Sequence, residues 1–314
     1  MNYLKDYREG EKFVGTYLCK QKQILKTKAG KTYYSLTLQD KTGTADGKIW
    51  ELNNGIANFE PMDYIHCEGM VTSFQGNLQM NISRVRISDE GEYDPADYVP
   101  CTNKDVGEMF SRILKYVASV QNKYLRKILE MYFVENKEFV DAFKKHSAAK
   151  SVHHGFMGGL LEHTLSVTDM CQYFAEHYPM IHRDLLITAA LFHDMGKIQE
   201  ISDFPMNDYT DDGQLLGHIY IGARCMENAA AQIPNFPPKL KNELVHCILA
   251  HHGKMEFGSP KVPAIMEAMA LHMADNADAK LQTLTEVFTQ VGDNMGWLGF
   301  NRMFESNLRK TSEE

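Results

Sequence analysis

Alternating apolar and polar positions run through the first ninety residues, and this pattern predicts β structure. Residues 33–38 alternate with the two-residue period of a half-buried strand, and turn-forming residues flank them on both sides. A strand before residue 28 and later strands at 44–50, 64–74 and 78–87 complete a set of five, with a short helical or irregular connector at 52–59. Five strands with a connector between the third and fourth suit an OB-fold, a small barrel that commonly binds single-stranded nucleic acid.

From residue 104 onward, apolar residues recur three and four positions apart, which predicts helices. The stretch 91–103 between the two patterns is acidic, contains proline and has no period, so we expect a linker. The sequence therefore predicts an α+β multidomain protein. We expect a five-stranded OB-fold β-barrel at 1–90, then an all-α domain at 104–314 whose functional core spans about 150–290.

The apolar run at 189–197 predicts a buried helix that ends in a candidate site. Its last turn carries the adjacent pair His193 and Asp194, and Gly196 is interpreted as the helix C-cap. An imidazole and a carboxylate side by side at a helix end can supply two of the ligands of a metal site.

Further imidazoles and a carboxylate lie on the neighbouring predicted helices. His163 shares a helix face with apolar residues, so it points inward, and a helix that ends at Gly253 carries two histidines in its final turn. Asp275 lies in the middle of the last long helix, predicted at 262–289, whereas Asp278 one turn further is expected to be solvated. The candidate metal ligands are His163, His193, Asp194, His218, His251, His252 and Asp275.

This last long helix also has a predicted buried side. We assign that side to Met266, Met269, Met273 and Ala277, which recur at helical spacing.

Imidazole and carboxylate ligands without cysteine suit Mn²⁺, with Co²⁺, Fe²⁺, Mg²⁺ or Zn²⁺ as alternatives. Seven ligands are too many for one ion but enough for two, with Asp194 bridging them. Two divalent ions about 3.5–4 Å apart can activate a hydroxide and clamp the oxygens of an in-line phosphoryl displacement. Lys197 can neutralise charge that develops on a phosphate, so Asp194 and Lys197 are the catalytic candidates.

The order His, His-Asp, His, His-His, Asp on successive helices resembles the HD phosphohydrolase superfamily, and residues 193–197 resemble its core motif. The doubled histidine is similar to the two-metal branch of that superfamily. By this resemblance, one ion would be held by His163, His193, Asp194 and Asp275, and the other by Asp194, His218, His251 and His252.

An OB-fold followed by such a domain resembles the YhaM family of bacterial 3′–5′ exoribonucleases. Further similarities are the strand at 33–38, the Gly-Gly-Leu-x-x-His-Thr run at 158–164 and residues 213–218. The resemblance implies a metal-dependent phosphodiesterase that trims single-stranded RNA to nucleoside monophosphates, with single-stranded DNA as a second candidate substrate. The 3′–5′ polarity comes from the resemblance alone.

The net charge of -8 argues against a protein coated in phosphate-binding surface, but residues 12–39 contain six lysines and no acid. A local basic stripe can follow a nucleic-acid backbone, and the alternative is a solvated lysine-rich hairpin. Tyr33 and Phe74 are candidates for stacking on bases. The predicted nucleic-acid contacts are Lys20, Lys22, Lys26, Lys28, Tyr33 and Phe74. Trp50 is a third candidate for stacking, but its position favours the barrel core.

Three other histidines are candidates for supporting roles. His153 and His154 precede the helix of His163, where a contact to phosphate or to a metal ligand is expected. His272 lies one turn from Asp275 and is expected to orient it. The polar N-terminus and the lack of an apolar run near 18 residues predict a cytoplasmic protein without membrane contact, and a homo-oligomer is left open.

Two alternative functions fit parts of the pattern. The metal centre alone suits an HD-domain hydrolase of a small nucleotide, such as a cyclic dinucleotide or a dNTP. The barrel alone suits a nucleic-acid-binding protein with an inactive HD domain. The barrel favours a polymeric substrate, and the complete ligand set favours an active enzyme, since buried His and Asp without metal cost stability.

Overall fold

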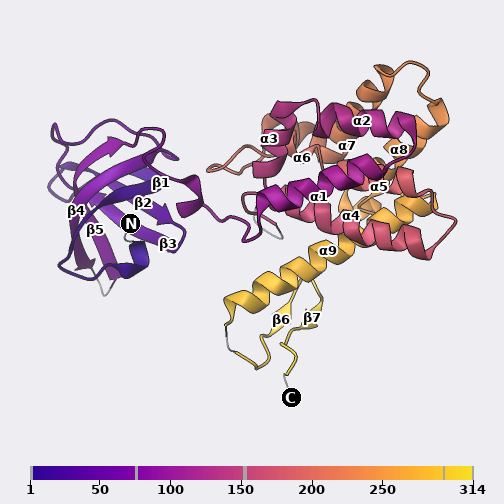
Figure 1. Cartoon of the computed structure of the whole chain (residues 1–314). Helices are drawn as coiled ribbons and strands as arrows, with labels where there is room; N and C mark the ends of the chain where they lie inside the picture. The colour runs from indigo at the N-terminus through magenta and orange to yellow at the C-terminus, as the bar shows by residue number, and fades with distance from the viewer. Residues whose placement is uncertain (1–2, 75–76, 151–153, 293, 313–314) are drawn as a thin grey trace. The chain divides into compact units, whose positions relative to one another are not determined.

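The computed structural model describes residues 3–74, 77–150, 154–292 and 294–312 (Figure 1). The chain divides into two compact units. The first unit is Met1–Asn103 with Ser202–Asp208, and the second is Lys104–Ile201 with Tyr209–Glu314.

The first unit is a closed five-stranded barrel with the strand order β1-β2-β3-β5-β4. Neighbouring strands are antiparallel except β3 and β5, which run parallel. This is the arrangement of an OB-fold, so the predicted barrel is confirmed. The strands are β1 (Lys12–Lys26), β2 (Thr32–Asp40), β3 (Gly43–Ile49), β4 (Tyr64–Phe74) and β5 (Asn77–Ile87).

The acidic segment expected to be a linker packs against this barrel. The ring of Tyr93 stacks on Tyr64 with centroids 4.0 Å apart, and Tyr98 is buried. The side-chain amide of Gln39 donates to the carbonyl oxygen of Tyr98 at 2.9 Å. The segment therefore packs on the barrel at least as far as Tyr98.

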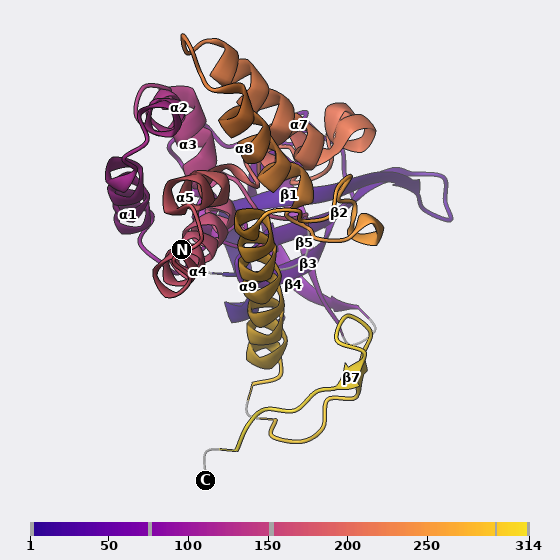
Figure 2. The same cartoon turned by 90° about the vertical axis from the view of Figure 1, so that its right-hand side faces the viewer.

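The second unit is built from helices around one apolar core (Figures 1 and 2). Helix α5 is buried at every residue from Leu185 to Phe192 and packs against α4, α8 and α9. Side chains cap several helix starts, as where Asp105 accepts from the backbone of Glu108. The helices are α1 (Val106–Ser119), α2 (Lys123–Phe133), α3 (Lys137–Lys145), α4 (Gly159–His177), α5 (Arg183–Phe192), α6 (Lys197–Glu200), α7 (Asp211–Ala231), α8 (Pro238–Ala250) and α9 (Met266–Gln290).

The predicted buried side of α9 is wrong. Met266, Met269 and Met273 are 41%, 42% and 55% exposed, whereas Ala268, Leu271 and Ala274 are fully buried. The two stripes have the same helical spacing. Helix α9 packs against α4 and α5, and the two buried alanines allow a close approach between helices. The prediction placed the methionines on the buried side because they are more hydrophobic than alanine, and it took no account of helix packing.

The C-terminal half of α9 extends away from the other helices of its unit (Figures 1 and 2). Two short antiparallel strands follow it, β6 (Phe300–Asn301) and β7 (Ser306–Asn307), so this unit is not purely helical. No helix among the described residues has the length and apolar character needed to cross a membrane.

Candidate metal centre and barrel surface

His193 and Asp194 lie in the turn between α5 and α6, and both are buried. The ring nitrogen Nδ1 of His193 lies 2.8 Å from the carbonyl oxygen of Ala190. A carbonyl oxygen only accepts, so Nδ1 carries the proton and the lone pair of Nε2 faces the opposite way. The helix end thus fixes which nitrogen is offered to a metal.

Gly196 does not cap this helix as we predicted, because its φ of -63° is right-handed. A Cβ atom on Gly196 would lie 2.1 Å from the carbonyl oxygen of His218 and 2.9 Å from the backbone nitrogen of Gly222. Glycine is needed here because the backbone of α7 passes directly against the His-Asp turn. That close approach brings His218 towards Asp194.

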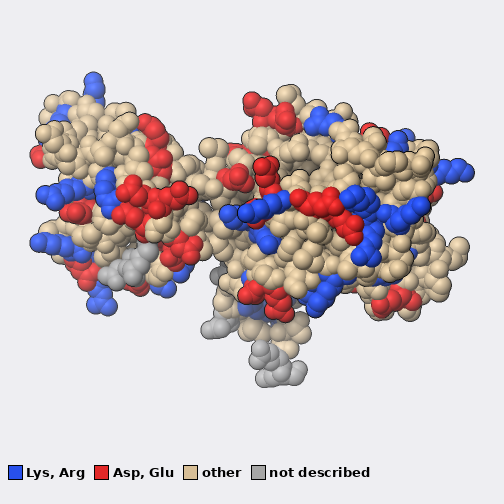
Figure 3. Space-filling model, turned by 45° about the horizontal axis from the view of Figure 1, so that its top comes forward, with Lys and Arg blue, Asp and Glu red and all other residues tan. Residues whose placement is uncertain are grey.

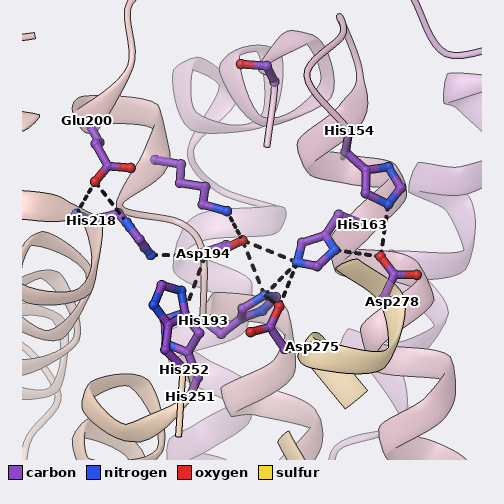
Figure 4. A network of polar contacts seen from close by, with 12 residues as sticks. His154, His163, His193, Asp194, Glu200, His218, His251, His252, Asp275 and Asp278 are labelled. Carbon is purple, nitrogen blue, oxygen red and sulfur yellow. Dashed lines mark hydrogen bonds and ion pairs between the residues drawn. The ribbon is translucent and has the colours of Figure 1, made fainter. Parts of the chain in front are cut away.

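Four of the predicted ligands converge at one point. The Nε2 atom of His163 lies 3.2 Å from Nε2 of His193, 3.3 Å from Oδ2 of Asp194 and 3.2 Å from Oδ1 of Asp275 (Figure 4). These side chains come from α4, from the end of α5 and from α9. We call them the first ligand group.

The other three predicted ligands form a second ligand group. The ligand atoms of His218, His251 and His252 all lie within 4.8 Å of one another. The Nε2 atoms of His218 and His251 are each 3.6 Å from Oδ1 of Asp194. One oxygen of Asp194 therefore faces each group, which is the position expected of a bridging carboxylate.

The four remaining imidazoles of the two groups are held in the same way as His193, with Nδ1 against an oxygen. Because each oxygen accepts, each ring presents Nε2 towards the centre. The oxygen partners are Asp278 for His163 at 2.7 Å, Glu200 for His218 at 2.9 Å, the Ile248 carbonyl for His251 at 2.6 Å and the Phe257 carbonyl for His252 at 2.8 Å.

Two of these partners, Asp278 and Glu200, were missed in the sequence. Asp278 is buried rather than solvated, and its sequence signal is a position three residues after Asp275 on the same helix face. Burial raises the pKa of Asp278, but hydrogen bonds from His154 and His163 outweigh that effect and hold it well below its usual range. Nothing in the sequence marks Glu200 beyond its place one turn after Lys197.

Several buried atoms of the centre have no protein hydrogen-bond partner among the described residues, notably Asp194 Oδ1, His218 Nε2 and His251 Nε2. A buried polar atom left unpaired costs about 1–3 kcal/mol, so this arrangement calls for a cation. Burial lowers the pKa of His252 to about 4 and also lowers that of His251. Both rings are therefore neutral near pH 7, as metal ligation requires, and the residues fit divalent ions.

Lys197 also faces this centre. It is buried, and its Nζ lies 2.6 Å from Oδ2 of Asp194. Burial lowers the pKa of Lys197, but the charge of Asp194 outweighs it and the pKa is raised. Lys197 is thus a charged partner of the shared carboxylate.

The three supporting histidines have separate outcomes. His153 lies outside the described residues. His154 is buried and its Nε2 lies 2.9 Å from Oδ2 of Asp278. His272 does not orient Asp275, to which no hydrogen bond joins it in the described chain. Its Nδ1 instead lies 2.9 Å from the carbonyl oxygen of His251.

The predicted lysine stripe lies on β1 and the β1–β2 hairpin, which projects from the barrel (Figure 2). Lys20, Lys26 and Lys28 are exposed, whereas Lys22 is half-buried. Its Nζ donates to the carbonyl oxygen of Phe59 at 2.6 Å and lies over the rings of Phe59 and Tyr34. Acidic and basic side chains are interspersed on the visible face of both units (Figure 3).

Trp50 is not in the barrel core, contrary to our assignment. It is 40% exposed and stacks on Tyr33, with ring centroids 4.6 Å apart and planes 26° apart. Its Nε1 donates to Oδ1 of Asn81 at 3.0 Å, which fixes the ring on the barrel surface. Phe74 is 61% exposed and lines a separate hollow with Leu78.

Comparison with known proteins identifies the family. The HD domain family matches residues 160–280. The 3′-5′ exoribonuclease YhaM of Geobacillus sp. strain WCH70 is 32% identical over 264 residues, which cover 83% of this chain and 80% of that protein. The chain belongs to the YhaM family of 3′–5′ exoribonucleases.

Other YhaM proteins match a larger part of the chain. The 3′-5′ exoribonuclease YhaM of Listeria innocua is 32% identical over 293 residues, or 90% of each protein, which is too long a match to omit either unit. Among solved structures, the second OB-fold domain of replication protein A from Methanococcus maripaludis covers 29% of this chain and 98% of that chain, with 20% identity and a TM-score of 0.24.

We predict that Gly196→Ala disrupts the centre, because the new methyl group forces α7 away from the His-Asp turn. Overpacking of this kind typically costs about 1–3 kcal/mol of unfolding free energy, and we expect Mn²⁺ binding to weaken as well. Thermal unfolding and calorimetric Mn²⁺ titration measure both effects.

Gly222→Ala is the matched control, because its Cβ would meet nothing closer than 3.6 Å. Wild-type Mn²⁺ affinity in Gly196→Ala would show that the close approach of α7 is not required.

Proposed function

We propose that this protein is a metal-dependent 3′–5′ exoribonuclease that releases nucleoside monophosphates from single-stranded RNA, with single-stranded DNA as a second substrate. The observation that carries the proposal is Asp194, whose two oxygens face two separate sets of imidazoles. The polarity of degradation rests on membership of the YhaM family.

The two ligand groups would hold two divalent ions, for which Mn²⁺ is the first candidate. His163, His193 and Asp275 would serve one ion and His218, His251 and His252 the other, with Asp194 shared. When bound, such a pair of ions activates water for attack and neutralises charge on the phosphodiester. The histidines contribute by being held with Nε2 directed inward.

Asp194 and Lys197 have complementary roles in this proposal. Burial raises the pKa of Asp194, but Lys197 and the surrounding imidazoles outweigh burial and keep the carboxylate ionised. Lys197 in turn places a fixed positive charge beside the point where phosphate charge develops. We infer that its main task is to hold the shared carboxylate in place.

The barrel would bind the strand. The stacked pair Tyr33 and Trp50 offers an exposed aromatic face for a base, and Lys20, Lys26 and Lys28 offer charge for phosphates. If the protein were a hydrolase of small nucleotides, this surface would have no role. If its HD domain were inactive, the unpaired atoms of Asp194, His218 and His251 would have no role.

A 5′-labelled single-stranded RNA tests the activity directly. With Mn²⁺ the protein should produce a ladder that shortens from the 3′ end, whereas Asp194→Asn should be at least about 100-fold slower because both ions lose a ligand. Chelation should stop the reaction and added Mn²⁺ should restore it. His177→Ala, outside both ligand groups, is the control. An Asp194→Asn protein that retains more than a few per cent of the rate contradicts the assignment.

Elemental analysis tests the number of ions. We expect about two divalent ions per wild-type chain, and about one in His218→Ala and His252→Ala, because those residues serve only the second group. Both variants should still lose most of the activity. One ion in a fully active wild-type protein would be incompatible with the two-ion proposal.

Trp50→Ala tests the barrel surface. Stacking contributes about 1–3 kcal/mol per base, so we expect KM for a long RNA to rise by about 10-fold while cleavage of a dinucleotide is unchanged. Trp297→Ala, which removes another exposed tryptophan, serves as the control. Equal effects of Trp50→Ala on long and short substrates would mean that the stack is structural.

A further inference from the structure

A chain of three buried side chains begins at His163 of the first ligand group and runs through Asp278 to His154. Nδ1 of His163 is 2.7 Å from Oδ2 of Asp278, and Nε2 of His154 reaches the same oxygen at 2.9 Å (Figure 4). The hydroxyl of Ser166 donates to the other oxygen, Oδ1. The carboxylate that orients His163 is therefore itself held by His154.

The fold holds His154 in an unusual backbone conformation. Its φ is 61°, in the left-handed region that non-glycine residues rarely adopt. Its carbonyl oxygen accepts from the backbone of Ala148 at 3.0 Å, and its own N–H donates to Glu286 at 3.2 Å. A Cβ on Gly159 would lie 2.0 Å from that carbonyl oxygen, so the chain is closely packed around it.

Two other roles for His154 do not fit these contacts. The side chain is 2% exposed and its Nε2 is directed at Asp278, so it does not face a phosphate in solution. His154, His163 and Asp278 are close enough to form an ion site of their own. However, a neutral imidazole has one lone pair, and His163 directs Nε2 to the first group, so its Nδ1 carries a proton.

We propose that His154 is a positioning residue for the first metal ion: it fixes Asp278, which fixes the tautomer and the orientation of His163. The proposal rests on the proposed role of His163 as a ligand. Without the donor on His154, Asp278 keeps two of its three side-chain partners, His163 and Ser166, and its carboxylate is held less firmly. The direction of the His163 ring is then less tightly fixed.

The effect should be confined to one ion. The imidazoles of the second ligand group are anchored by Glu200 and by the carbonyl oxygens of Ile248 and Phe257. None of these three partners belongs to the chain that His154 supports. Loss of His154 should therefore weaken the first ion and leave the second unchanged.

Two variants of the full-length protein separate positioning from packing. His154→Phe keeps a ring but removes the donor, whereas His154→Gln restores an N–H donor near the place of Nε2. In calorimetric titrations with Mn²⁺ we expect His154→Phe to weaken one binding step by about 10- to 100-fold, and His154→Gln to recover most of that loss. The rate on labelled RNA at low Mn²⁺ should fall in parallel and recover at high Mn²⁺, with KM for RNA unchanged.

The affected ion is identified in the His252→Ala background, where only the first ion should bind, so His154→Phe should weaken that remaining step. Adding His154→Phe to Asp278→Asn should cause little further loss, since the effect passes through Asp278. The control is His146→Phe, another buried histidine, whose nitrogens face the carbonyl oxygens of Ser147 and Ile201. It should lower the melting temperature without changing first-ion affinity.

The outcomes distinguish the possible failures. Unchanged Mn²⁺ binding in His154→Phe overturns the positioning role, even if the protein is less stable. Equal loss in His154→Phe, His154→Gln and His146→Phe assigns the effect to packing and also overturns it. A wild-type protein that binds no Mn²⁺ refutes the proposed function, and the positioning role with it.

Discussion

The sharing of one buried carboxylate between two sets of imidazoles is the constraint on which the centre depends. Oδ2 of Asp194 faces His163 and His193, and Oδ1 faces His218 and His251. A charged group in the interior is tolerated only when it is surrounded by compensating partners. Five structural segments must therefore reach one point: α4, the turn after α5, α7, the end of α8 and α9. The apolar core of the helical unit keeps them there.

Close backbone contacts determine where the ligand side chains meet. Gly196 allows α7 to touch the His-Asp turn, and Gly253 leaves room for the ring of His272 against the end of α8. Each imidazole is then aligned by an oxygen acceptor behind it, from a backbone carbonyl or from a buried acid. The protein thus fixes ligand direction through main-chain geometry first and through acidic side chains second.

The parts of the fold and of the site that depend on residue type and on the local periodicity of apolar residues can be predicted from the sequence. The barrel could be predicted from the alternation of apolar and polar residues. The seven ligand candidates could be predicted because imidazoles and carboxylates on apolar helices are uncommon unless they bind a partner, and the structure brings all seven together. Asp278 and Trp50 were misjudged for the opposite reason. From sequence alone, Asp278 is expected to be solvated and Trp50 is expected to be buried in the barrel. The partners that bury Asp278 and hold Trp50 on the surface come from distant parts of the chain and are known only from the tertiary fold. The methionine face of α9 shows the same limit, since two stripes of equal period compete and only packing selects one.

The break in α7 at Gly217 has an electrostatic consequence. With φ 73° and ψ 152°, Gly217 interrupts the helix, so His218 begins a second helical segment beside the metal centre. The first turn of a helix carries partial positive charge equivalent to roughly half an elementary charge, which would repel a cation nearby. Glu200 accepts from the backbone N–H of His218 at 2.9 Å and from its ring with the same oxygen. The carboxylate therefore cancels the macrodipole at the point where the helix end would oppose cation binding, while it also aims the ligand.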